Sequence, residues 1–392
     1  MLLKNSLLAL LGLSFSAVAF GQGVEILGNA GTTLENLKLV IVADSNSGLN
    51  APSDVAINPL KPTDLYVVNH GDNSAVVLQL DATGNLSKAS LRTSMGAEHF
   101  MPNPMALAFA PSGFFATIHD IDTVTQDSTP ADFMGPTLWT QTWFDGGHGS
   151  HMDMLHNSPS GIGIAWVHGN AYVVNDGAHG CLTVYDFRND HNYGGADHSD
   201  GVTLRYADGL LERVEGVPAG VIFDKEANTA YAVDSGHNRI VSINLGLDFR
   251  TQSGFDYISI KNTAYKVTRN LEPNYDGTIQ RYVDGPVLNS LVDGAAAGLQ
   301  TPAGIALYKD TIYVSDYTGS QILAFSKEGK LLDKLALADL LPAAKNAALG
   351  GIEFDANGNL YITDLLNNRV YRLEAAVKST APAPATVPAP VN

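Results

Sequence analysis

Three histidines lie within nine residues of one another in a glycine-rich segment, and a carboxylate stands among them. They are His148, His151 and His156, with Asp153 between the last two. Imidazole nitrogens bind zinc, copper or iron, and three of them could hold a metal while leaving one coordination position open. We therefore interpret these four residues as candidate metal ligands. The alternative is a solvated loop in which the histidines bind nothing.

A second segment, from Asp186 to Asp200, combines carboxylates with imidazoles in a loop that contains glycine. Clustered carboxylate oxygens suit calcium, so we expect calcium or another divalent metal here. The alternative is that the aspartates cap turns within the loop. The candidate ligands are Asp190, His191, Asp197, His198 and Asp200.

The first nineteen residues have the pattern of a cleavable signal peptide. Lys4 supplies a positive charge, an apolar run follows, and Ala17-Val18-Ala19 forms a small-x-small cleavage site. No later stretch reaches the ~18 apolar residues that a membrane-spanning helix needs. We therefore predict a secreted or periplasmic protein without a transmembrane segment.

The composition narrows the range of partners. Lysine plus arginine number 23 and aspartate plus glutamate number 40, which gives a net charge of −17. This negative charge disfavours binding to nucleic acids and suits solubility or cation binding. We expect a monomer. A single cysteine, Cys181, excludes an intrachain disulfide, and its place at the start of an apolar strand predicts a buried thiol.

A repeated pattern predicts the architecture. A proline or glycine, two small or acidic residues and an aliphatic residue precede a Tyr-Val-x-Asp sequence, as in Pro302-Ala-Gly304-Ile followed by Tyr313-Val-Ser-Asp316. Six copies start at residues 52, 104, 159, 218, 302 and 350. Recurring units of short strands that cannot bury both faces alone predict an all-β, six-bladed β-propeller. Two separate domains are the alternative.

The same pattern sets the expected domain limits. Residues 20–35 lead into a propeller that covers residues 36–374, and a strand at residues 37–43 pairs with the last blade and closes the ring. Uneven spacing of the repeats predicts insertions at about 120–137 and 245–300. Residues 375–392, rich in proline and alanine, are expected to form a disordered tail.

The repeats resemble the NHL family of six-bladed propellers. The resemblance is carried by the Pro-x-Gly-Ile-Ala pattern, by Tyr361-Ile-Thr-Asp364 and by Asn367-Asn368-Arg369-Val. It implies that the repeated aspartate is mainly structural. Peptidyl-amidoglycolate lyases share such blades, and their zinc histidines directly follow the repeat proline. None of the corresponding residues here is histidine: they are Ser53, Met105, Ser160, Ala219, Ala303 and Gly350.

Strand direction predicts where the histidines lie. In a blade with strands A to D, the B–C and D–A connections emerge on the same face. His70 and His119 follow second strands, and the segment from His148 to His156 precedes a first strand. We therefore expect these histidines on the channel-mouth face, where His70 or His119 could add a ligand. The loop from Asp186 to Asp200 should face the other side, unless it folds over the rim.

Together these patterns predict an exported propeller binding protein with a metal site near the channel mouth. Its ligand would be a small molecule, a protein or a peptide. The alternative is a metal-dependent hydrolase or lyase acting at the channel. The chain has no Gly-x-Ser-x-Gly, P-loop or dinucleotide motif, and no catalytic residue can be named from the sequence.

Overall fold

The fold consists mainly of short antiparallel strands. The computed structural model describes residues 25–27, 33–93, 97–122, 134–141, 151–252, 255–272 and 274–375. The predicted signal peptide, the tail from residue 376 and His148 lie outside the described residues. In the part of the chain that is described, no helix is long and apolar enough to cross a membrane.

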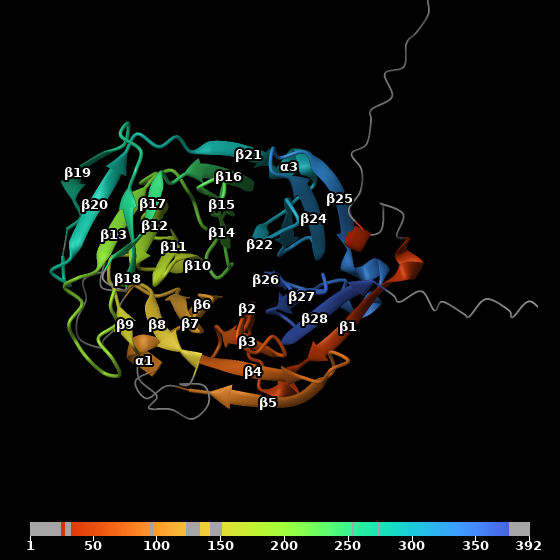
Figure 1. Cartoon of the computed structure of the whole chain (residues 1–392). Coiled ribbons are helices and arrows are strands. Elements are labelled where there is room, and N and C mark those ends of the chain that lie inside the picture. The colour runs from red at the N-terminus through yellow and green to blue at the C-terminus, as the bar shows by residue number, and fades with distance from the viewer. Residues whose placement is uncertain are drawn as a thin grey trace, which may run out of the picture.

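Six sheets stand in a ring around a central channel, with β2, β6, β10, β14, β22 and β26 innermost (Figure 1). The first three sheets begin with four strands in chain order. They comprise β2 (Pro52–Ile57), β3 (Asp64–Asn69), β4 (Ser74–Leu80) and β5 (Leu86–Arg92); β6 (Pro104–Phe109), β7 (Phe114–His119), β8 (Thr137–Thr140) and β9 (Asp153–Met154); and β10 (Gly161–His168), β11 (Ala171–Asp176), β12 (Cys181–Asp186) and β13 (Val202–Tyr206).

The remaining three sheets follow the same order. They comprise β14 (Val221–Asp224), β15 (Thr229–Asp234), β16 (Arg239–Asn244) and β21 (Asn289–Asp293); β22 (Pro302–Tyr308), β23 (Thr311–Asp316), β24 (Gln321–Ser326) and β25 (Leu331–Ala336); and β26 (Leu349–Phe354), β27 (Leu360–Asp364), β28 (Arg369–Ala375) and β1 (Leu37–Ala43). Short helices join some of them: η1 (Glu25–Leu27), η2 (Leu34–Asn36), η3 (Ser45–Ser47), α1 (Ala97–Phe100), α3 (Gly294–Ala297), η4 (Leu337–Asp339) and η5 (Pro342–Ala344).

The predicted all-β propeller is confirmed, but its blades are not six equal units. Five sheets have four strands, whereas the third has six, because β20 (Ile279–Asp284) and β19 (Lys266–Asn270) extend it beyond β13. β20 pairs with β13 in parallel. The insertion predicted at 245–300 therefore supplies these strands, the hairpin of β17 (Leu247–Gln252) and β18 (Phe255–Ile260), and the outer strand β21.

The second strand of each blade shows why the repeats fold in this way. Every residue of β3, Asp64–Asn69, is buried, because neighbouring sheets cover both of its faces. Such strands need apolar residues on both sides, which explains runs such as Leu65-Tyr66-Val67-Val68. The Cys181 thiol is also fully buried, as predicted, and burial raises its pKa well above the usual value.

The aspartate of the repeat has the structural role that the resemblance implied. Asp316 ends β23, and its carboxylate accepts hydrogen bonds from the backbone N–H groups of Gln300 and Thr301, each at 2.9 Å. These two residues lead into β22 of the same sheet. The aspartate therefore fixes the entry of the innermost strand against the end of its neighbour.

The predicted closing strand is present. β1 pairs antiparallel with β28, and Leu37 lies opposite Ala375. The last sheet is thus built from both ends of the described chain, which leaves the ring without a free seam.

Candidate metal centre

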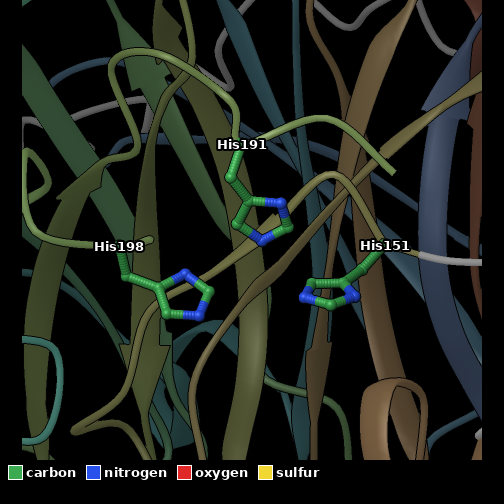
Figure 2. A group of neighbouring side chains, drawn as sticks. All are labelled: His151, His191 and His198. Atoms are coloured by element: carbon green, nitrogen blue, oxygen red, sulfur yellow. The ribbon is translucent and has the colours of Figure 1, made fainter. Parts of the chain in front are cut away.

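Three imidazole rings converge on the outer side of the ring, between the second and third sheets. His151, His191 and His198 each offer a nitrogen, and these nitrogens all lie within 4.8 Å of one another. Figure 2 shows the three rings turned toward a common space. The sequence did not pair these residues: it assigned His151 to one candidate site and His191 and His198 to another.

Backbone hydrogen bonds bring the two segments together. The N–H of His191 donates to the carbonyl of Met152 at 3.1 Å, and the N–H of Gly194 donates to the carbonyl of His151 at 3.3 Å. His151 stands two residues before β9, and the other two histidines lie in the connection from β12 to β13. The loop therefore packs against the neighbouring blade, where it meets His151 and Met152.

Asp153 orients one of the three rings. Nδ1 of His198 hydrogen-bonds to Oδ1 of the buried Asp153 at 2.7 Å. Because a carboxylate accepts, Nδ1 carries the proton and Nε2 keeps its lone pair for a ligand. Burial tends to lower the pKa of His198, but the hydrogen bond and charge of Asp153 raise it above its usual value. Asp153, predicted as a metal ligand, is not among the three converging residues and instead positions the ring of His198.

His191 is oriented in a similar way. Its Nδ1 lies 2.6 Å from the backbone carbonyl of Asn192, so this nitrogen donates. Its Nε2 is buried and has no hydrogen-bond partner among the described residues. A buried polar atom without a partner costs free energy, and a bound cation would satisfy it.

His151 is held by an aromatic neighbour. The ring of Phe100, in α1, stacks on it with centroids 3.8 Å apart and planes 20° from parallel. Burial, together with the nearby imidazoles of His191, His198 and His99, lowers the pKa of His151 to about 3. The ring is therefore neutral near pH 7, which is the form that binds metals.

The other histidine of the first cluster, His156, has a different partner. Its Nδ1 hydrogen-bonds to Oδ1 of Asp276, and its backbone N–H donates to Oδ2 of the same residue at 3.0 Å. Its ring centroid lies 6.4 Å from that of His198. His156 therefore lies next to the histidine triad, our name for His151, His191 and His198, but is not part of it. Asp276 comes from the insertion, 120 residues away, and nothing in the sequence indicates this pairing.

His119 and His70 lie away from the triad. His119 is fully buried, with Nε2 2.9 Å from the hydroxyl of Thr117 and Nδ1 3.1 Å from the carbonyl of Gly135. Both of its nitrogens are occupied, and burial lowers its pKa to about 3. His70 follows β3 in the first sheet, and neither residue belongs to the group of nitrogens that could share a metal.

The aspartates of the second candidate loop bond to the loop itself. Asp190 accepts the N–H of Asn192, Asp197 accepts the N–H and hydroxyl of Ser199, and Asp200 accepts the side-chain amide of Asn189. These contacts are the turn-capping alternative described above. Among the described residues, no group of carboxylates suited to calcium forms in this loop.

His151 does not lie at the channel mouth, contrary to the prediction. The sequence pattern placed the whole histidine run between a fourth strand and the next first strand. In fact the short fourth strand β9, Asp153–Met154, lies within the run, so His151 precedes it. None of the three histidines is among the residues that line the central channel.

Comparisons with known proteins bear on the fold. No protein-family model matches the sequence, and no curated protein matches it. One similar solved structure is an auxiliary nutrient binding protein from Bacteroides ovatus, 14% identical, with a TM-score of 0.50 over 86% of this chain and 76% of that one. Another is regucalcin, a calcium-binding protein from Agrobacterium tumefaciens, 12% identical, with a TM-score of 0.50 over 86% of this chain and 92% of that one. These likenesses show that the chain has a β-propeller fold.

Proposed function

We propose that this chain is an exported, NHL-type propeller that binds a divalent transition metal through His151, His191 and His198. The observation that carries the proposal is the convergence of three imidazole nitrogens within 4.8 Å. Two of these rings donate from Nδ1 to an oxygen, so Nε2 is left as the metal-binding atom. Zinc is the first choice, because it accepts three imidazoles and a fourth ligand in a tetrahedral site.

The three nitrogens lie further apart than a bound zinc ion requires. In a tetrahedral site, two nitrogens that are each about 2.1 Å from zinc are about 3.4 Å apart. A pair of nitrogens 4.8 Å apart would therefore have to approach by roughly 1.4 Å on binding. The loop that carries His191 contains Gly194 and Gly195, whose backbones allow the loop to adjust.

A binding role fits the position better than catalysis does. Enzymes usually enclose substrates in the main cavity of the fold, and the triad lies outside the central channel. A metal bound here would link the second blade to the loop between β12 and β13 of the third blade. The Bacteroides ovatus propeller is described as a nutrient binding protein, which accords with a binding role for this fold.

The test is elemental analysis of protein purified without a chelating tag. We expect about one zinc, copper or iron per chain, and less than a tenth of that in the double variant His191→Ala, His198→Ala. His70→Ala, which removes another loop histidine in a different blade, should keep the full content. Zinc at 100 times its dissociation constant should stabilise the parent by about 2.7 kcal/mol, but not the double variant. A parent without stoichiometric metal, even after zinc addition, would overturn the proposal.

A further inference from the structure

The central channel contains a cavity of about 580 Å³. The innermost strands of all six sheets line it, so it belongs to the whole ring and is separate from the histidine site. Its walls are mostly aliphatic and aromatic. They include Phe109, Trp166, Ile222, Leu307 and Phe354.

Two carboxylates stand in this apolar wall on adjacent strands. Asp54 lies on β2 and Glu353 on β26, and both border the cavity together with Asp355. The charge of Asp54 adds to burial in raising the pKa of Glu353 to about 8. No lysine, arginine or histidine is among the lining residues, so nothing in the wall neutralises these acids.

Asp54 is anchored by the backbone. Its Oδ1 accepts the N–H of Val55 at 2.9 Å, and its Oδ2 accepts the N–H of Leu107, on the next blade, at 3.0 Å. Burial raises its pKa to about 7 although these two bonds oppose the shift. Gly351 makes room for it, because a Cβ at that position would lie 1.7 Å from Oδ1.

Glu353 has no such partner. Among the described residues it makes no hydrogen bond or ion pair, and its side chain is half-buried with its open side in the channel. An acid in a largely apolar cavity, next to a second acid and without a countercharge, is costly for the fold. Other copies of the repeat carry Ala56, Ala108 or Ala306 at the position of Glu353, so an alanine would suffice for packing.

We propose that the channel binds a small organic cation, with its ammonium group between Asp54 and Glu353 and its hydrocarbon part against the apolar wall. An ammonium group supplies the missing positive charge and donates hydrogen bonds to both carboxylates. The aromatic side chains offer further attraction for a cation. A calcium ion fits less well, because it needs six to eight oxygens and both oxygens of Asp54 already accept backbone hydrogen bonds.

The experiment is calorimetric titration of the full chain with benzylammonium at about pH 8.5, where the carboxyl groups are ionised. Benzyl alcohol, a neutral analogue, and calcium are titrated alongside. We expect one benzylammonium per chain and at least tenfold weaker binding of benzyl alcohol. Glu353→Gln should weaken benzylammonium binding at least tenfold, and Asp54→Asn should also weaken it. Glu328→Gln, the same change at an exposed turn, should bind as the parent does.

Three results would overturn the proposal. Equal affinity for benzylammonium and benzyl alcohol would show a purely apolar cavity. Unchanged binding by a folded Glu353→Gln variant would place the cation elsewhere. Saturable binding of calcium that displaces benzylammonium would identify the two carboxylates as a metal site. All three are independent of the histidine triad, whose loss should leave benzylammonium binding unchanged.

Discussion

At the scale of single residues, His119 shows how a histidine can hold a core together instead of binding a metal. Nδ1 of His119 donates to the carbonyl of Gly135, because a carbonyl can only accept. Nε2 of the neutral ring therefore accepts from the hydroxyl of Thr117, which in turn accepts from Nε1 of Trp139. The chain of bonds has a single consistent direction and fixes the neutral tautomer of His119.

Replacing this side chain should weaken the fold and leave metal content unchanged. His119→Leu deprives Thr117 and Gly135 of a buried partner, so we expect the free energy of unfolding to fall by about 1–3 kcal/mol in urea denaturation. His70→Leu, at a half-buried loop position, should change it by less than about 0.5 kcal/mol. A His119→Leu variant that unfolds like the parent but loses its metal would restore His119 as a ligand.

The candidate residues were only partly predictable from the sequence. The spacing of His148, His151 and His156 indicated a site, but proximity in sequence did not select the residues that meet in space. His151 meets residues 40 and 47 positions later, because backbone bonds join two loops of different blades. The two acids of the channel, Asp54 and Glu353, are less evident in the sequence. They occupy positions of the repeat at which the other copies have small or apolar residues.

At the scale of elements, β1 should be essential to closure. Leu39 is buried in the cluster formed with the last two sheets, whereas Ile41, on the same strand, is 40% exposed. We expect Leu39→Asp to lower the free energy of unfolding by about 3 kcal/mol or more, because it buries an unpaired charge. Ile41→Asp makes the same change at a partly exposed position and should cost less than about 1 kcal/mol. Similar losses in both variants, measured by urea denaturation, would contradict this role of β1.

Inner elements were more predictable than outer ones, for a physical reason. The second strand of each blade is buried along almost its whole length, as in β3 and β23, which imposes the same residue pattern in every copy. Outer strands carry weaker patterns: β9 has two residues, and β20 joins β13 through a pairing 77 residues apart. Such pairing depends on long-range contacts that a local pattern does not encode.

At the scale of the whole molecule, the channel acids should make stability depend on pH. In the unfolded chain Asp54 and Glu353 would ionise near their ordinary pKa values of 3.8 and 4.5, whereas the folded values are about 7 and about 8. Between these values the folded chain holds protons that the unfolded chain has released. The stabilisation is complete below about pH 4 and is lost as the pH rises through about 7 to 8.

The variant Glu353→Gln should lose less stability than the parent as the pH rises. The variant's gain in free energy of unfolding over the parent should be larger at pH 9 than at pH 5, by at least about 1.4 kcal/mol. This amount corresponds to a shift of one pKa unit. The whole pKa shift of Glu353 would give a larger difference in the free energy of unfolding, but water in the channel screens the charge of its carboxylate. Urea denaturation at both pH values provides the measurement, with Glu328→Gln as a control that should show no such difference. An identical effect of Glu353→Gln at both pH values would contradict the raised pKa.

The pairing of Leu37 with Ala375 has a mechanical consequence. β1 and β28 run antiparallel, so the two ends of the ring leave this strand pair at the same place. Tension applied between those ends would load the backbone hydrogen bonds one after another, as in unzipping, instead of shearing them all at once. The last sheet is therefore the mechanically weak point of the ring, and a pull on the ends would open it there before the other blades bear any force.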